Sequence, residues 1–179
     1  MNFKRITSPA HPLYAEAINL YKISFPLHEQ REEASQVEIL TNPFYHFDVV
    51  CDHDKFIGEI LYWDIEEFRY IEHFCILPSM RNHQYGQKIL TALKDNTPLI
   101  LEIDPPVDTI SCRRKEFYER CGFVENPYAH THPPYHKNNI DHELVVMSSP
   151  KVLTPEEYGI FSQRLQSMVM AISFAGSKY

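Results

Sequence analysis

One stretch, residues 68–93, sets what this chain of 179 residues can fold into. Its first part has the period-2 alternation of a strand with two faces, with Phe68, Tyr70, Phe74 and Ile76 on one side and Arg69, Ile71, His73 and Cys75 on the other. Pro78 and Ser79 end this strand, because proline cannot donate to a sheet ladder. Ile89, Leu90 and Leu93 then recur at helical spacing. The stretch therefore predicts a strand, a polar loop and a helix.

The loop between that strand and that helix is polar and basic, and it contains one glycine, Gly86. The first N–H groups of a helix have no partner within the helix and lie at the positive end of its dipole. A glycine beside them lets a phosphate approach closely. The loop therefore favours a phosphate site flanked by Arg81 and Lys88. An ordinary strand-to-helix connection with solvated charges has the same pattern.

The same stretch resembles the central motif of the GCN5-related N-acetyltransferase (GNAT) family, a strand followed by Arg/Gln-x-x-Gly-x-Gly/Ala and a helix. The second glycine of that motif is Gly86, and Gln84 replaces the first. That replacement matters if the position needs a positive φ, which glycine adopts most freely. The resemblance implies that acetyl-coenzyme A binds through the residues of this loop, namely Arg81, Asn82, His83, Gln84, Tyr85, Gly86 and Gln87.

A second block, residues 117–123, resembles the family's F-Y-x-x-x-G-F segment. The resemblance implies that Tyr118 is the general acid that protonates the departing coenzyme A thiolate. A tyrosine, with a pKa near ~10, keeps its proton until that thiolate forms. The alternative is that Tyr118 only packs, with its hydroxyl at the surface. On the same predicted helix, Ser111 stands where the family often has asparagine, and it is the expected pantetheine contact.

The resemblance also assigns roles along the central strand. Glu72 is the expected general base, because a carboxylate among aromatic side chains is desolvated and its pKa should rise. The alternative is a solvated glutamate at the edge of the sheet, or one paired with Arg69 or His73. The backbone of Cys75 and Ile76 is expected to pair with pantetheine like an added strand, with a backbone N–H near Ile76 stabilising the oxyanion. The Cys75 thiol is expected to be inert rather than a covalent nucleophile.

Two loops are expected to form the acceptor site. In the family, the connection between the first two helices walls this site, which implies contacts from Phe25, His28 and Glu29. The histidine-rich loop 126–139 is expected to place Tyr135 and His136 near the acceptor. A metal site in that loop is the alternative, but its histidines lack a cysteine or carboxylate at familiar zinc spacing. No metal site is therefore predicted.

The remaining patterns predict a mixed α/β (α+β) domain, with a mostly antiparallel central sheet and helices on both faces. Strands are expected at 2–6, 46–51, 55–63, 98–103, 123–125 and 142–148, and helices at 12–25, 29–40 and from 108 or 111 to 121. This is also the element order of the GNAT family, so residues 1–150 are expected to form its domain. Residues 151–179 form a helical tail that opens with the capping box Thr154–Glu157. The tail is expected to pack on its own domain or on a second subunit, as in a homodimer.

Charge and cysteine content restrict the class of protein. The net charge of −7 does not fit a nucleic-acid-binding surface and would suit a cationic acceptor. No apolar run is long enough to cross a membrane, and the first residues lack the apolar core of a signal peptide. The four cysteines form no CxxC pair, which is typical of a reducing cytoplasm.

The sequence thus predicts a cytoplasmic N-acetyltransferase that moves an acetyl group directly from acetyl-coenzyme A to a primary amine of a small molecule or peptide, without a metal. The alternative is a non-catalytic acyl-coenzyme A binding or sensing module on the same fold.

Overall fold

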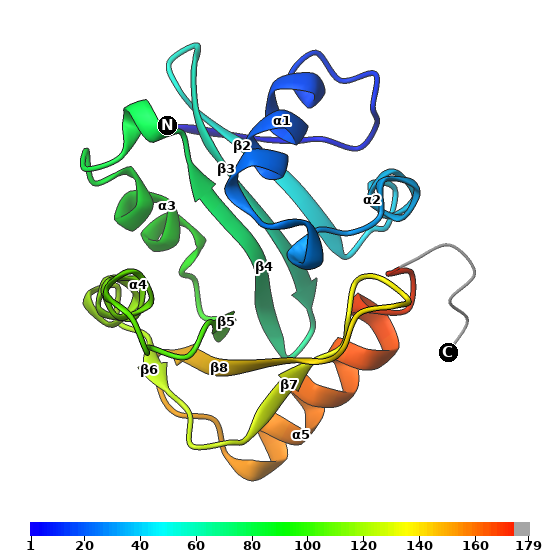
Figure 1. The fold of residues 1–179 in the computed structure, drawn as a ribbon. Helices are drawn as coiled ribbons and strands as arrows, with labels where there is room; N and C mark the ends of the chain where they lie inside the picture. Colours follow the sequence, from blue (N-terminus) through cyan, green and yellow to red (C-terminus); the bar gives the residue numbers. More distant parts are fainter. Residues whose placement is uncertain (174–179) are drawn as a thin grey trace.

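The computed structural model describes residues 1–173 and contains one eight-stranded sheet. Its strand order is β1-β2-β3-β4-β5-β8-β6, and β7 pairs with β8 (Figure 1). All pairs are antiparallel except β4 with β5. The predicted mixed sheet is therefore confirmed. The strands are β1 (Asn2–Arg5), β2 (Tyr45–Asp52), β3 (Lys55–Ile65), β4 (Phe68–Ile76), β5 (Leu99–Ile103), β6 (Val124–Glu125), β7 (His130–His132) and β8 (His142–Ser149).

Helices cover both faces of the sheet, as predicted. Figure 1 shows α3 (Tyr85–Leu93) and α4 (Thr109–Arg120) together on the side away from α1 (Tyr14–Ser24) and α2 (Glu33–Ile39). The apolar side chains form two clusters. One joins α1, α2 and the tail helix α5 (Pro155–Arg164) to the sheet, and the other joins α3 and α4 to it. No helix within residues 1–173 has both the length and the apolar character needed to cross a membrane.

Two predicted elements differ from the structure. The helix expected at 29–40 is a 3₁₀ turn, η1 (Leu27–Glu29), followed by the shorter α2. Gln30 separates them in an extended conformation, and the N–H of the next residue, Arg31, donates to the Tyr21 hydroxyl. The loop expected at 126–139 includes the short strand β7, which pairs with β8.

The tail helix packs on the sheet of its own chain. Its predicted capping box is confirmed, since the Thr154 hydroxyl accepts from the Glu157 N–H and the Glu157 carboxylate accepts from the Thr154 N–H. The Phe161 ring lies 5.4 Å from that of Tyr70, measured between centroids. A π-helical turn, Leu165–Val169, follows α5, and residues 174–179 of the expected tail lie outside the described part.

The feature of the sheet that creates the site is a β-bulge at Glu72. On β3, Leu61 and Tyr62 are neighbours, but they pair with His73 and Ile71 on β4, so Glu72 is an extra residue. A bulge turns the residues that follow it onto the other face. Phe68, Tyr70 and Cys75 accordingly lie in one cluster, whereas Ile71, Phe74 and Ile76 lie in the other. The alternation predicted for residues 68–76 is therefore wrong beyond Ile71.

The pairing between β4 and β5 ends at the same place. The last aligned pair is Ile71 with Leu101, although β4 continues to Ile76 and β5 to Ile103. The carboxyl ends of the two parallel strands therefore separate. A crevice outside the carboxyl ends of parallel strands is where α/β folds commonly bind ligands.

Candidate active site

A cleft of about 1170 Å³ lies between the separated ends of β4 and β5. The first turn of α3 lines one end of it, and α4 lines it along one side as far as Arg114, which contacts Asp104. The loop 24–29 and residues 132–135 and 138–142 line the other end. The two loops predicted on the acceptor side thus face the loop predicted to bind coenzyme A.

The predicted phosphate loop forms the α3 end of the cleft. Arg81, Asn82, Gln84, Tyr85, Gly86 and Gln87 all line it. Gln84 is the N-cap of α3 and its side chain caps no N–H group, so the first backbone N–H groups of the helix remain available to a ligand. His83 is exposed and does not line the cleft, so its predicted cofactor contact is not supported.

The position of the missing glycine does require a positive φ. Gln84 has φ 63° and Asn82 has φ 64°, both in the left-handed region. For a residue with a side chain this conformation costs roughly 1–2 kcal/mol. The loop therefore keeps the backbone shape for which glycine is suited, and Gln84 adopts it with some strain.

The second glycine of the motif also has a packing role. A Cβ atom on Gly86 would lie 3.0 Å from Cζ of Phe117 on α4, closer than side chains normally pack. Gly86 therefore allows α4 to pack against the first turn of α3. The role of Gly86 in letting a phosphate approach stays a prediction beside this packing role.

Tyr118 lies on α4 and lines the cleft. Its ring packs edge-on against Phe117 and Phe123, and no residue within 1–173 forms a hydrogen bond with its hydroxyl. Burial raises the pKa of Tyr118 to about 12. The hydroxyl therefore stays protonated at neutral pH, which is the state that a general acid needs.

Ser111 does not have the predicted contact. It is 5% exposed, does not line the cleft, and completes a capping box at the start of α4. Its N–H donates to Asp108 Oδ1 at 2.8 Å, and its hydroxyl accepts from the Asp108 N–H at 3.1 Å. The prediction for Ser111 is corrected, because its polar groups cap the helix instead of facing a ligand.

Cys75 and Ile76 line the cleft on the unpaired part of β4. The Cys75 thiol donates to Glu59 Oε1 at 3.5 Å, and burial followed by the nearby Glu59 carboxyl raises its pKa. A thiol with a raised pKa is a poor nucleophile at neutral pH. This supports the inert role predicted for the side chain and leaves the backbone as the part that could contact a ligand.

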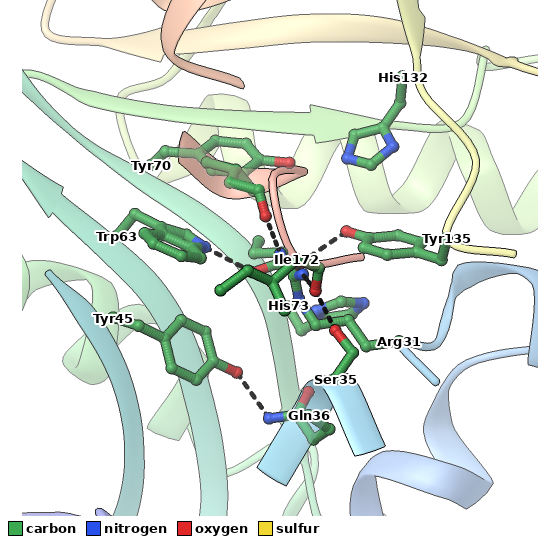
Figure 2. A network of polar contacts seen from close by, with 12 residues as sticks. Arg31, Ser35, Gln36, Tyr45, Trp63, Tyr70, His73, His132, Tyr135 and Ile172 are labelled. Atoms are coloured by element: carbon green, nitrogen blue, oxygen red, sulfur yellow. Dashed lines mark hydrogen bonds and ion pairs between the residues drawn. The ribbon is translucent and has the colours of Figure 1, made fainter. Parts of the chain in front are cut away.

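Glu72 does not have the environment predicted for a base. Its carboxylate is fully buried and accepts from the Arg31 guanidinium at 2.8 and 2.9 Å, the Trp63 indole at 2.7 Å and the Tyr135 hydroxyl at 2.9 Å (Figure 2). Burial alone would raise the pKa of Glu72, but Arg31, with His73 and these hydrogen bonds, holds it below its ordinary value. The predicted rise is therefore wrong. All these donors stabilise the charged carboxylate and oppose its protonation.

The same network brings the predicted acceptor loops together. Phe25, His28, Glu29 and Tyr135 all line the cleft. His136 does not, but its Nε2 donates to the Leu27 carbonyl at 2.9 Å and so links the loop 133–141 to η1. The prediction for His136 is thus corrected from a substrate contact to a link between two walls of the cleft.

Glu29 is the carboxylate at this end with a raised pKa. Burial and then the negative charge of Asp104 raise it. Asp104 follows β5, and its carboxylate contacts Arg114 at 2.6 Å and His142 at 3.5 Å. Sequence reasoning missed Asp104 and His142 as site residues. Their positions, next to the ends of strands β5 and β8, were the available signal.

Comparisons with known proteins agree with this arrangement. The family model described as an acetyltransferase (GNAT) domain matches residues 43–125. Comparison with curated proteins finds no match. A solved structure described as an acetyltransferase from the GNAT family of Bacteroides thetaiotaomicron superposes with a TM-score of 0.89 at 30% identity, covering 96% of this chain and 99% of that one.

More distant structures share the fold. An aminoglycoside 6'-N-acetyltransferase complexed with coenzyme A has a TM-score of 0.60 at 16% identity, covering 87% of this chain and 99% of that one. The ribosomal-protein-S18-alanine N-acetyltransferase from Escherichia coli has a TM-score of 0.56 at 14% identity, covering 87% and 96%. The cleft and the motif loop agree with these matches. Because it matches the Bacteroides protein over nearly its whole length, the chain belongs to the GNAT family of acetyltransferases.

Proposed function

We propose that the protein transfers an acetyl group from acetyl-coenzyme A directly to a primary amine. The observation that carries this proposal is the cleft at the separated ends of β4 and β5, which joins a helix N-terminus at one end to the partly exposed carboxylate of Glu29 at the other. Two substrates that enter from opposite ends would meet beside Tyr118. Holding two reactants in this way is itself a large part of catalysis.

The donor would bind along α3 and β4. The open N–H groups at the start of α3 suit the pyrophosphate, and Arg81 lines the cleft beside them. The pantetheine would follow the unpaired edge of β4 past Ile76 and Cys75. The thioester would then lie near Tyr118, whose hydroxyl would protonate the departing thiolate.

The acceptor would bind at the opposite end, between η1 and the residues that follow β5. Glu29 is our choice of general base in place of Glu72. Its raised pKa makes it a stronger base than an ordinary carboxylate. Both residues line the cleft, but the Glu29 side chain is 27% exposed, whereas the Glu72 carboxylate is buried and bonded to four side-chain N–H and O–H groups. The Glu29 carboxylate favours a cationic amine, while the charge of Asp104 is shared with Arg114, 2.6 Å away.

The proposed acceptor is a small-molecule amine or a peptide amine. Both kinds are considered because solved structures of the same fold include enzymes named for an aminoglycoside and for a ribosomal-protein alanine. The experiment is a measurement of free thiol release from acetyl-coenzyme A with a panel of amines of both kinds, with mass spectrometry of the product. We expect release that depends on an amine. Tight coenzyme A binding without amine-dependent release from any acceptor would contradict an enzyme and favour a non-catalytic acyl-coenzyme A binding module.

A further inference from the structure

A group of metal-ligating side chains lies at the acceptor end of the cleft. His28 and Glu29 come from η1, and His142 begins β8, far away in the sequence. Each offers one ligand atom, and these atoms all lie within 4.8 Å of one another. The histidines at 130 and 132, in contrast, are buried beside Glu102. The converging histidines are thus not the ones that the sequence pattern singled out.

The group is accessible and has a supporting carboxylate. The side chains of His28, Glu29 and His142 are 56%, 27% and 36% exposed. Nε2 of His142 lies 3.5 Å from Oδ1 of Asp104. A carboxylate beside a ligating imidazole orients its ring and increases its basicity, which is the usual arrangement around metal sites.

We propose that His28, Glu29 and His142 bind one divalent transition-metal ion of the zinc class in the absence of substrates. A bound ion would hold the Glu29 carboxylate, so metal binding and the proposed role of Glu29 as base exclude each other. Zinc accepts a donor set of two imidazoles and one carboxylate, with a fourth position open to water or a substrate. Magnesium and calcium prefer sites made of oxygen ligands alone, so this donor set does not suit them. In a tetrahedral site with bonds of about 2.1 Å, ligand atoms are about 3.4 Å apart. The more than half-exposed His28 has room to rotate toward the other two.

The test measures binding on the full chain, stripped with a chelator, without acetyl-coenzyme A or acceptor. We expect one equivalent of Co²⁺ with the visible absorption of a tetrahedral site, displaced by one equivalent of Zn²⁺ in calorimetry. His28→Gln and His142→Gln should each weaken Zn²⁺ binding more than tenfold. Asp104→Asn should weaken it by about 10–100-fold. The matched control is His53→Asn, which removes a 95% exposed imidazole from the β2–β3 turn and should leave the affinity unchanged.

Because His28 is exposed, its variant is expected to fold, and a thermal melt of each variant checks this. No stoichiometric binding by the wild type would overturn the proposal, as would equal affinity in folded His28→Gln and wild type. A loss in His53→Asn as large as in His28→Gln would do so too, since it would indicate scattered surface binding. The measurement involves no acetyl transfer, so its failure is distinguishable from failure of the proposed function.

Discussion

The Arg31 guanidinium contacts Oε1 of Glu72 through two nitrogen atoms, Nε at 2.9 Å and Nη2 at 2.8 Å, and both side chains are completely buried. Arg31 also donates to the carbonyls of Val169 at 2.6 Å and Ile172 at 3.2 Å. The pair therefore connects the bulge of β4 to the chain that follows α5 (Figure 2). Glu72 thus has a structural role: it belongs to the wall of the cleft, but its carboxylate is fully buried and held by Arg31.

Glu72→Gln is expected to destabilise the fold by about 3–5 kcal/mol, because it leaves the Arg31 charge buried without a partner. Denaturant unfolding at pH 7 measures this. The lowered pKa of Glu72 means that its stabilisation is present above the unfolded pKa and lost as pH falls through the folded one. The difference between wild type and variant should therefore shrink below about pH 4.3. Equal unfolding free energies at pH 7 would contradict this account.

Gly86→Ala is expected to lower the melting temperature, because the added Cβ would lie 3.0 Å from the Phe117 ring. Overpacking of this kind costs typically about 1–3 kcal/mol. Phe117→Leu in the same chain should restore part of the loss, and a double-mutant cycle measures the coupling. Coenzyme A affinity, followed in parallel, separates the two roles of the glycine. If the double variant regains stability but binds coenzyme A more weakly than wild type, Gly86 also acts on the ligand.

Gln84→Gly is expected to change stability by less than about 1 kcal/mol, since relief of the left-handed strain offsets the greater freedom of glycine in the unfolded chain. Gln84→Val should destabilise the protein by about 1–3 kcal/mol, because a β-branched residue fits φ 63° poorly. Unfolding curves of the two variants check this. Equal stability of the glycine and valine variants would show that this φ carries no strain.

The elements encoded within a few neighbouring residues were predictable. The capping box at Thr154 and the helix end before Gly122, which has φ 81°, depend on short spacings and were expected from the sequence. The family motif likewise located the α3 end of the cleft. Ser111 shows a limit of the motif. Its spacing of three from Asp108 is itself a capping pattern, and the local hydrogen bonds leave no polar group for the cofactor.

The bulge and the acceptor end depend on contacts between distant residues. Nothing near Glu72 in the sequence shows that β3 skips it, because that depends on how two strands align. Arg31, the partner of Glu72, is equally distant in the sequence. The burial of the Glu72 carboxylate was therefore predictable, but the positive charge that lowers its pKa was not. His142 reaches η1 only because β8 lies beside β5 in the sheet.

Tyr118→Phe is expected to lower kcat by about 10²–10⁴-fold, the usual contribution of a positioned acid. The ring contacts with Phe117 and Phe123 remain, so coenzyme A affinity and melting temperature should change little. Steady-state kinetics with a good acceptor, together with calorimetry, separate kcat from binding. Full turnover in this variant would exclude Tyr118 as the acid.

Glu29→Gln is expected to remove the acidic limb of the pH dependence of kcat/KM. That limb reports the free enzyme's base in its protonated form, and the raised pKa of Glu29 places it above that of an ordinary glutamate. Asp104→Asn should shift the limb to lower pH, because the negative charge of Asp104 helps to raise the pKa of Glu29. Assays with a chelator present keep any bound metal out of the comparison.

The control for this base assignment is Glu72→Gln, measured below its melting temperature. It should keep the acidic limb, since the Glu72 carboxylate is fully buried against Arg31 and its pKa is lowered. Loss of the limb in Glu72→Gln and its retention in Glu29→Gln would reverse the assignment. If both variants keep the limb, the base is another group at this end of the cleft. His142 lines that end and is then the next side chain to replace.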